Sequence, residues 1–307
     1  MIDANLIGFL ADKLKIEQQD LIEKDIILQR IVFMLSQHKD FTEDFVFKGG
    51  TCLIKCYLGY YRFSEDLDFS FVKQEEWKGK SDKSIRKMLS LRISILMGIF
   101  SKMALDAGMD FKQDKNNKRY VEFGGSNKFV TFKLWYDSTA LRVPAFVKIQ
   151  INFVEKFLHP FKRLMVHSVA KHVFSKEMEF LFPEYAFLNS RTELLCYDLQ
   201  EILAEKVRAI LTRRGMKWRD FIDVYMILRE HRYPWKNTRK EAIDKSCFML
   251  RYEKYLQNMK SKERELRELR FGEGSLLLVA IGDDFKEFIE GLKVHLKDIL
   301  EDISKQP

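Results

Sequence analysis

The hydrophobic and polar positions along the chain change their period after its middle. In "EDLDFSFV", Leu67, Phe69 and Phe71 alternate with polar residues, a period of two that is typical of a strand with one buried face. From Arg191 onward, apolar residues recur at the three- or four-residue spacing of an amphipathic helix. The pattern therefore predicts an α+β first part containing a sheet, followed by a helical part.

The first part is predicted to contain helices as well as strands. "EQQDLIEKDIILQRIVFMLSQ" has nearly helical apolar spacing, and "SDKSIRKMLSLRISILMGIFSKMALDAG" begins at a capping Ser81 and ends at Gly108. "DFVFKGG" is predicted to be a strand that enters a turn, and "TCLIKCYLGY" a short helix that begins at Thr51. "RYVEFGG", "KFVTFKLWY" and "AFVKIQINFVE" are rich in β-branched and aromatic residues, which favour strands.

The second part is predicted to be a set of amphipathic helices. "RTELLCYDLQEILAEKVRAILTRR" predicts one helix, with Leu195 and Leu199 on its apolar face, and "KWRDFIDVYMILREH" predicts another. The last seventy residues or so are mostly charged helix, interrupted at "RFGEGS". The chain has 5 prolines and no proline-rich linker, so the boundary is soft. We expect residues 1–185 to form the sheet-containing core and residues 186–307 the helical domain.

Composition and charge narrow the class of protein. The 307 residues are 46% hydrophobic and 13% aromatic, enough for a real core, which excludes global disorder. The formal net charge is +8. Such a charge suits a polyanionic partner, most commonly nucleic acid, although excess lysine can also serve solubility alone.

Cysteine usage and hydropathy predict a cytoplasmic protein with no membrane partner. The cysteines are Cys52, Cys56, Cys196 and Cys247; they form no C-x-x-C pair and have no histidine at zinc-finger spacing, so we expect buried, reduced thiols. The N-terminus is not a signal peptide, and the longest apolar stretch, "ISILMGIF", is too short to span a bilayer. The scattered histidines give no expectation of zinc, and no Walker A, nucleophile-elbow or dinucleotide motif occurs.

The stretch "FKGGTCLIKCYLGYYRFSEDLDFSF", residues 47–71, combines Gly-Gly-Thr with Asp-x-Asp. Glycines let the backbone approach a phosphate, and N–H groups at a helix start point toward an anion, where Thr51 adds a hydroxyl. Asp66 and Asp68 project from one face of the predicted strand and can share magnesium, which takes carboxylate oxygens. Separately, each element is often only a turn or a solvated hairpin. Their ordered combination favours a triphosphate and magnesium site.

These residues resemble the signature of the AbiEii/AbiGii toxin family of nucleotidyltransferases. "KGGTCLIKCYLGYYRFSEDLDFS" matches the family's Gly-Gly/Ser turn followed by Asp-x-Asp, and "EILAEKVRAILTRRGMKWRDFIDVYMI" is similar to its downstream motif. The resemblance covers roughly residues 40 to 230. It implies the polymerase β-like nucleotidyltransferase fold, a mixed sheet flanked by helices, with the helical domain completing the active-site cleft.

The resemblance assigns expected roles to individual residues. Lys48, Gly49, Gly50 and Thr51 would hold the triphosphate, and Asp66 and Asp68 would bind Mg²⁺. Arg62, and also Arg213 and Arg214, could contact a γ-phosphate or an RNA backbone, although the latter two also suit a helix C-terminus. Lys206 would approach a phosphate, and Asp223, with Asp220 as the competing candidate, would complete the pocket. The alternative for these downstream residues, including Glu201 and Glu205, is a solvated charged helix face, which we favour for Asp220.

One position departs from the pattern of the fold. A third carboxylate often lies on a following strand, and the expected strand here is "FVKIQINFVE", whose central positions are Gln150 and Asn152. An amide oxygen can bind a metal but makes a poor base. Either the third ligand is dispensable, or Glu155 or Asp223 replaces it.

The expected activity is transfer of a nucleoside monophosphate from an NTP to an acceptor hydroxyl. The acceptor is an RNA end, by resemblance tRNA, or a protein side chain. The resemblance also implies the toxin of a toxin–antitoxin or phage-defence system, with a separately encoded antitoxin. Two alternatives stay open: an RNA- or partner-binding module without catalysis, and a phosphotransferase. The run "FVTFKLWY", beside Lys128 and Lys133, could stack bases, but we expect it to be a core strand.

Overall fold

The computed structural model describes residues 1–125, 127–269 and 277–305. The chain divides into two compact units, Met1–Glu155 with Phe161–Cys196, and Lys156–Pro160 with Tyr197–Pro307. The first unit is α+β and contains a sheet, and the second is helical, as the sequence pattern predicts. The division at Cys196 lies beyond the soft boundary expected near residue 185, because residues 193–196 form a strand of the sheet.

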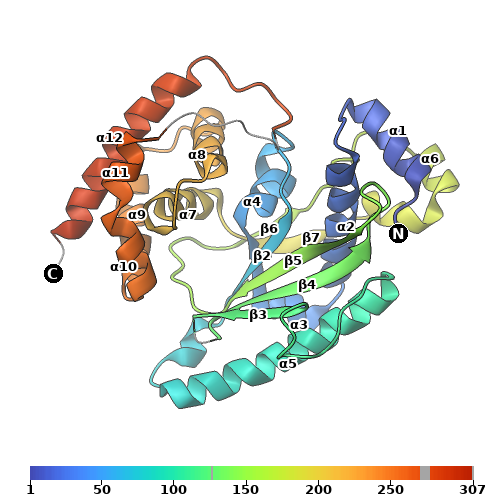
Figure 1. Cartoon of the computed structure of the whole chain (residues 1–307), viewed down its shortest axis with the longest axis horizontal. Helices are drawn as coiled ribbons and strands as arrows, with labels where there is room; N and C mark the ends of the chain where they lie inside the picture. The colour runs from blue at the N-terminus through green and yellow to red at the C-terminus, as the bar shows by residue number, and fades with distance from the viewer. Residues whose placement is uncertain (126, 270–276, 306–307) are drawn as a thin grey trace. The chain divides into compact units, whose positions relative to one another are not determined.

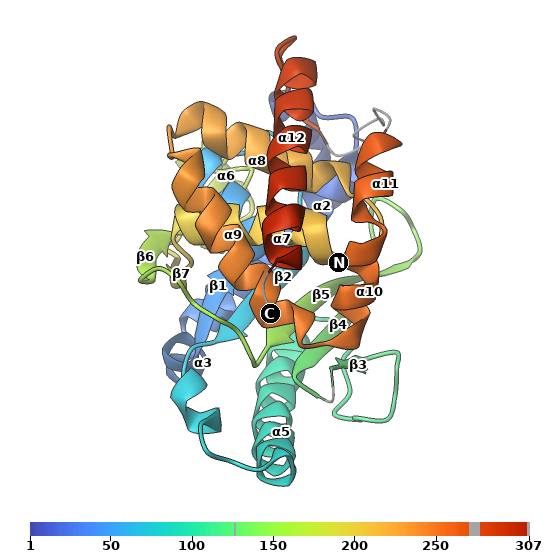
Figure 2. The ribbon, with the colours of Figure 1, turned by 90° about the vertical axis from the view of Figure 1, so that its left-hand side faces the viewer.

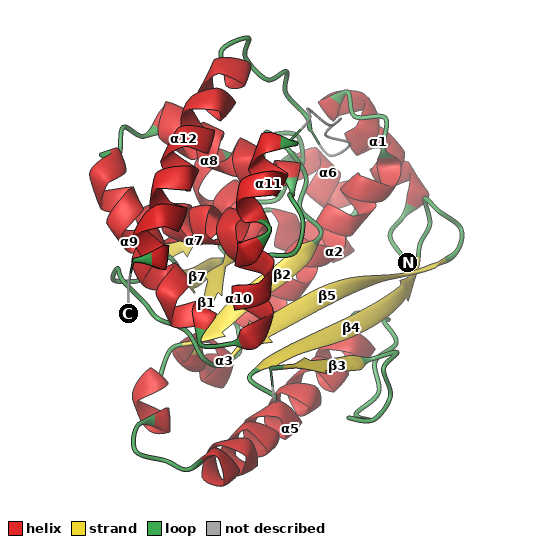
Figure 3. Cartoon of the chain, turned by 60° about the vertical axis from the view of Figure 1, so that its left-hand side comes forward, coloured by secondary structure: helices red, strands yellow, loops and turns green. Residues whose placement is uncertain are grey.

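A mixed seven-stranded sheet organises the first unit, with strand order β3-β4-β5-β2-β1-β7-β6 (Figures 1 and 3). Its strands are β1 (Phe45–Lys48), β2 (Asp66–Phe71), β3 (Val121–Gly124), β4 (Phe129–Asp137), β5 (Pro144–Asn152), β6 (Lys162–Met165) and β7 (Glu193–Cys196). Strand β2 lies between antiparallel β1 and parallel β5. The strands predicted from "DFVFKGG", "EDLDFSFV" and the three aromatic runs are therefore confirmed.

The two faces of the sheet differ sharply in polarity. Phe47 pairs with Phe69 across β1 and β2, and Phe69 pairs with Ile151 of β5, so these buried side chains share one face. Because side chains alternate along a strand, the opposite face carries polar positions. These are Lys48, Asp66, Asp68, Lys148, Gln150 and Asn152. The alternation in "EDLDFSFV" thus separates a packed face from a polar face.

Helices α3 (Lys39–Asp44) and α5 (Asp82–Asp106) pack on the aromatic face. The ring of Phe41 lies 4.9 Å from that of Phe69, and the ring of Phe100 lies 4.8 Å from that of Phe132. Figure 1 shows α5 running along the sheet beside β3 and β4. Its N-cap is Ser81, which accepts a hydrogen bond from the Ser84 N–H, as predicted.

Helix α5 is also long and apolar enough, by length and composition alone, to cross a membrane. Its inward side chains, including Leu96 and Phe100, are buried, and it is a core helix of the first unit. Further helical segments of this unit include α1 (Ala4–Leu14), α2 (Gln19–Ser36), α6 (Lys176–Leu181) and the short 3₁₀ segments Gln74–Trp77 and Pro183–Leu188.

The chain leaves β1 through a short helical segment that begins at the two glycines. Helix α4 covers Gly49–Cys52, and a π-helical turn, η1, follows at Leu53–Leu58. The predicted start at Thr51 is therefore two residues too late. Gly49 adopts φ +80°, a conformation that favours glycine and lets the helix begin directly at the strand end.

The second unit is a helical bundle, drawn in orange and red in Figure 2. Its helices are α7 (Leu199–Thr212), α8 (Trp218–Glu230), α9 (Trp235–Leu250), α10 (Glu253–Lys260), α11 (Lys262–Arg267) and α12 (Phe285–Ser304). Helix α7 contacts α8, α9, α10 and α12. Residues 199–212 are buried except Gln200, so α7 is the core of this unit. The interruption predicted at "RFGEGS" lies outside the described residues.

The helix predicted from Arg191 is wrong over its first part. Residues Glu193–Cys196 form β7, and α7 begins only after Asp198, which caps it by accepting a hydrogen bond from the Gln200 N–H. A four-residue apolar run fits either a strand or a helix, and pairing with β1 and β6 decides for the strand here.

Candidate active site

Asp66 and Asp68 lie on the polar face of β2, as the sequence predicts. Asp66 pairs in register with Lys148 of β5, and the Lys148 Nζ is 3.9 Å from Asp66 Oδ1. Asp68 pairs with Lys48 on one side and with Gln150 on the other. Both aspartates are partly exposed, and the Asp66 side chain retains 26% of its accessible surface. They are therefore neighbouring carboxylates that a solute can approach.

Gly49 brings the backbone against the second of these carboxylates. A Cβ at position 49 would lie 3.0 Å from both the Cβ and the Cγ of Asp68, and closer still to Oδ2. No side chain fits in that space, and the positive φ also disfavours one. The Gly-Gly turn predicted from the sequence is thus held directly beside Asp68.

Gly50 and Thr51 are fixed by the segment that precedes β2. A Cβ at position 50 would lie 2.6 Å from Arg62 Nη2, so the guanidinium occupies the space a side chain would need. Arg62 is only 2% exposed, and its Nη1 donates to the Phe63 carbonyl at 2.7 Å. The buried Thr51 hydroxyl donates to the Asp66 carbonyl and lies 2.8 Å from Ser64 Oγ. The buried side chains of Thr51 and Arg62 thus hold the Gly-Gly turn in place.

The two amides found where a third carboxylate is often present, Gln150 and Asn152, lie on β5, the strand that pairs with β2. Gln150 of β5 is the register partner of Asp68, and Asn152 is the partner of Ser70. Glu155 follows the strand and is buried; its carboxylate pairs with Lys48 Nζ at 3.0 Å and accepts from Asn152 Nδ2 at 2.9 Å. Lys48 is thus held at the strand end by Glu155. The Glu155 carboxylate is in turn engaged by the Lys48 ammonium and the Asn152 amide.

The oxygens presented here have the chemistry of a magnesium site. Mg²⁺ is usually held by one or two carboxylates together with water and substrate phosphates. Asp66 and Asp68 supply two such carboxylates on one strand face, and the Gly49 backbone packs directly against Asp68. The residues present therefore fit the ion that the fold implies.

Aromatic and cationic side chains continue along the same polar face. Trp135 of β4 and Phe146 of β5 are register partners, with ring centroids 4.7 Å apart. The Arg119 guanidinium lies 4.0 Å from the Trp135 ring, and Lys133 and Lys148 each have Nζ 5.7 Å from the Phe146 ring. We call Arg119, Lys133, Trp135, Phe146 and Lys148 the aromatic platform. The core interpretation of "FVTFKLWY" holds for Phe132 and Leu134, whereas Lys133 and Trp135 are partly exposed.

The downstream residues form a buried ion network in the helical unit. Lys206 Nζ of α7 lies 2.9 Å from Asp220 Oδ1 and 2.6 Å from Asp223 Oδ2 of α8, and Arg213 Nη1 is 3.3 Å from Asp220 Oδ2. Asp220 is 1% exposed and Asp223 is fully buried. Burial raises the pKa of Asp220, but the charges of Lys206 and Arg213 outweigh it and hold that pKa below its usual value.

The solvated helix face favoured for Asp220 is therefore wrong. The same correction applies to Glu201 and Glu205, which are buried and pair with Lys245 Nζ. Glu201 also accepts the N–H groups of Leu158 and His159, each at 2.8 Å. Sequence spacing shows that charges share a helix face, but it does not show what covers that face.

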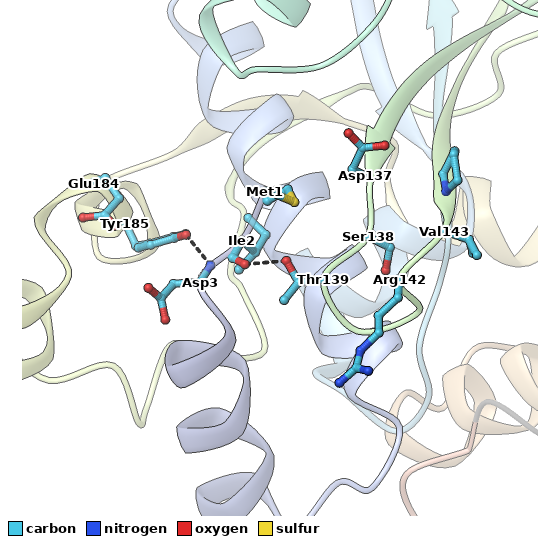
Figure 4. Close-up of a pocket in the computed structure, with 11 residues that line it drawn as sticks. Met1, Ile2, Asp3, Asp137, Ser138, Thr139, Arg142, Val143, Glu184 and Tyr185 are labelled. Carbon is cyan, nitrogen blue, oxygen red and sulfur yellow. Dashed lines mark hydrogen bonds between the residues drawn. The ribbon is translucent and has the colours of Figure 1, made fainter.

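A surface cavity of about 720 Å³ lies elsewhere in the first unit, beside the N-terminus (Figure 4). Asp3, Thr139, Arg142 and Tyr185 are among its lining residues; the Asp3 N–H donates to Tyr185 Oη and Thr139 Oγ1 donates to the Ile2 carbonyl. None of the residues predicted for the active site lines it. No sequence pattern pointed to this cavity, because its lining residues come from three distant segments.

A mixed sheet with a glycine turn held against an Asp-x-Asp strand is the arrangement that the sequence resemblance led us to expect of a nucleotidyltransferase. Residues 30–305 match the family model described as "Nucleotidyl transferase AbiEii toxin, Type IV TA system". The chain therefore belongs to the AbiEii nucleotidyltransferase toxin family, a family of enzymes. This confirms the resemblance inferred from the two sequence motifs.

The solved structure of a nucleotidyltransferase toxin supports this fold. MenT4, a nucleotidyltransferase toxin from Mycobacterium tuberculosis H37Rv, is similar with a TM-score of 0.51 and 17% identity, over 98% of this chain and 90% of that one. JHP933 from Helicobacter pylori gives a TM-score of 0.44 at 15% identity, over 93% and 94% of the two chains. A putative nucleotidyltransferase from H. pylori gives 0.42 at 15%, over 99% and 98%. No curated protein matches the chain in sequence.

Proposed function

We propose that the chain transfers a nucleoside monophosphate from an NTP to a hydroxyl of an RNA acceptor, by family resemblance a tRNA, and that it needs Mg²⁺. The observation that carries the proposal is the placement of Asp66 and Asp68 on one strand face with Gly49 packed against Asp68. This arrangement joins a metal-binding carboxylate pair to a backbone turn that a phosphate can approach. As a toxin of this family, the chain would be counteracted by a separately encoded antitoxin.

The chemistry divides between the turn and the strand. The acceptor oxygen attacks the α-phosphorus, the bond from that phosphorus to the bridging oxygen breaks, and pyrophosphate leaves. Bound magnesium would neutralise charge on the phosphate oxygens. Gly49 and Gly50 would offer backbone N–H groups to the triphosphate, with Thr51 and Arg62 fixing the turn, and Asp66 and Asp68 would hold the ion. Lys48, paired with Glu155, places a positive charge at the end of β1.

The proton of the acceptor hydroxyl needs a base. Gln150 cannot accept it because an amide is not basic, and Glu155 is engaged by Lys48 and Asn152. We therefore assign the proton to a carboxylate of the Asp66–Asp68 pair. The third ligand considered at Glu155 or Asp223 is not needed in this proposal, because two carboxylates are a usual protein contribution to a magnesium site.

An RNA acceptor is supported by charge and by the aromatic platform. The chain carries a formal net charge of +8, and phosphate contacts supply much of the affinity for nucleic acid. Trp135, with Arg119 over its ring, offers a stacking surface on the same sheet face as the aspartates. Base–aromatic stacking contributes about 1–3 kcal/mol per base.

A second candidate function is an RNA-binding module without catalysis. It is favoured by Gln150, the amide that stands in register with Asp68. Such a module would bind RNA without magnesium and would keep that binding when Asp66 is changed. A phosphotransferase would place a phosphoryl group, rather than a nucleotidyl group, on the acceptor.

The test uses the full chain with Mg²⁺, total RNA and each α-labelled NTP in turn. We expect label to enter RNA with the wild type and Asp106→Asn, and to be lost with Asp66→Asn and Asp68→Asn. Asp106 is an exposed carboxylate at the end of α5 and serves as the matched control. Equal labelling by wild type and both site variants would contradict the proposal, and RNA binding retained without labelling would favour the second candidate.

A further inference from the structure

A cluster of three cysteines lies behind the Gly-Gly turn. Cys52 ends α4, Cys56 lies in the π-helical turn η1, and Cys196 ends β7. Their sulfur atoms all lie within 4.8 Å of one another, and Cys56 Sγ is 3.8 Å from Cys196 Sγ. The sequence predicted separate buried thiols, because Cys196 is far along the chain from the other two. The parallel pairing of β1 with β7, through Phe47 and Cys196, brings them together.

We infer that Cys52, Cys56 and Cys196 form a binding site for a thiophilic metal ion. Metal–thiolate bonds of about 2.3 Å place two sulfur ligands of one ion about 3.8 Å apart, and Cys56 and Cys196 already have a separation of 3.8 Å. Helix α4 and the π-helical turn that follows it position two of the ligands, since Cys52 and Cys56 are four residues apart and their sulfurs lie close together. A small movement of the Cys52 sulfur toward the other two sulfurs completes the ligand set.

The cluster lies in a largely buried environment. The Lys55 ammonium, adjacent to Cys56 in the sequence, is buried and pairs with Asp25 at 2.7 Å. Cys52 and Cys196 are fully buried, whereas Cys56 is partly exposed and gives an ion a way in.

The ligand set points to soft d¹⁰ ions. Among the described residues, no histidine or carboxylate joins the three sulfurs within the same distance. Thiolates select Cu(I) and Zn(II) over hard ions such as Mg²⁺, and a three-sulfur set without a fourth protein ligand suits Cu(I) or Cd(II). The cluster therefore differs in chemistry from the oxygen ligands of Asp66 and Asp68, and the inference stands apart from nucleotidyl transfer.

The test measures metal binding by the reduced, metal-stripped full chain under anaerobic conditions. Cd(II) and chelator-buffered Cu(I) are the probes, read by native mass spectrometry, thiolate-to-metal absorption and X-ray absorption. We expect one ion per chain with three sulfur neighbours. Loss of an outer-shell partner alone typically costs about 10–100-fold in metal affinity, so Cys56→Ser and Cys196→Ser should each weaken binding by at least about 100-fold.

Cys247→Ser is the matched control, because Cys247 lies in α9 of the helical unit. Cys247→Ser should leave metal affinity unchanged. The metal-free Cys52→Ala variant is compared with the wild type by melting temperature and circular dichroism. This comparison shows whether lost binding comes from the missing ligand or from misfolding. The inference is overturned if no ion is retained, if fewer than three sulfurs surround it, or if Cys247→Ser weakens binding as much as Cys56→Ser. The inference is also overturned if the protein kept in reductant has lost the mass of two hydrogens and binds no ion, because that result indicates a Cys56–Cys196 disulfide.

Discussion

At the scale of single residues, both glycines of the Gly-Gly turn are closely packed. Gly49 combines a positive φ with direct contact to Asp68, while Gly50 is closed off by Arg62. Gly59, which directly follows η1, also has a positive φ but has open space around its Cβ position. A comparison of substitutions at Gly49 and Gly59 therefore separates the effect of backbone strain from the effect of displacing the Asp68 carboxylate.

Gly49→Ala is expected to abolish nucleotidyl transfer, whereas Gly59→Ala should retain most of it. Both substitutions strain the backbone by about 1–3 kcal/mol, but only the first pushes against Asp68. Urea unfolding and labelling of RNA, measured on both variants, separate the two effects. Equal activity of the two variants would contradict the role given to the Gly49–Asp68 contact.

Lys206→Met should destabilise the helical unit strongly. It leaves the buried Asp220 and Asp223 with less compensating charge, and breaking a buried pair costs about 3–5 kcal/mol. Lys217→Met, at an exposed lysine just before α8, is the control and should change stability little. Urea unfolding followed by circular dichroism measures both. If Lys206→Met lowers transfer without lowering stability, Lys206 acts on the reaction itself, as the family resemblance implies.

At the scale of elements, the proposed RNA acceptor would bind along β4 and β5, which carry Trp135 and Phe146 of the aromatic platform. Trp135→Ala should weaken RNA binding by about 1–3 kcal/mol, the contribution of one stacked base. Phe123→Ala is the matched control, because Phe123 pairs with Val130 and so lies on the opposite face of the sheet. Filter binding at several salt concentrations measures the affinities. An equal loss in both variants would remove the platform from the account.

The sequence was most informative where period and chemistry coincide. Alternation in "EDLDFSFV" placed Asp66 and Asp68 on one face, and Ser81 and Gly108 marked both ends of α5, because these signals are local. The strand at Glu193–Cys196 was missed because only its pairing with β1 and β6 distinguishes it from a helix. The burial of Asp220 and the three-cysteine cluster were also missed, because each depends on contacts between distant segments.

At the scale of the whole molecule, stability at low pH should depend on the buried network of the helical unit. The pKa of Asp220 is held below its unfolded value of about 3.9, so its ionised form stabilises the fold. That contribution is complete above the unfolded pKa and is lost as the pH falls through the lower folded pKa. Acid stability is thus linked to Lys206 and Arg213.

Asp220→Asn should therefore be less stable than the wild type at neutral pH, with a difference that shrinks below about pH 4, where the unfolded carboxyl takes up a proton. Urea unfolding of both proteins between neutral and acid pH gives the two curves. A stability difference that is constant across this range would show that Asp220 does not contribute through its charge.

The central claim is that this chain adds a nucleotide to RNA. Intact mass spectrometry of purified tRNA tests it most directly, after incubation with the full chain, Mg²⁺ and all four NTPs. The account predicts a mass increase of one or more nucleoside monophosphate residues, with none for Asp68→Asn. An RNA mass increase of a single phosphoryl group would contradict the claim. An unchanged RNA mass, obtained with wild-type protein that retains its toxicity, would contradict it as well.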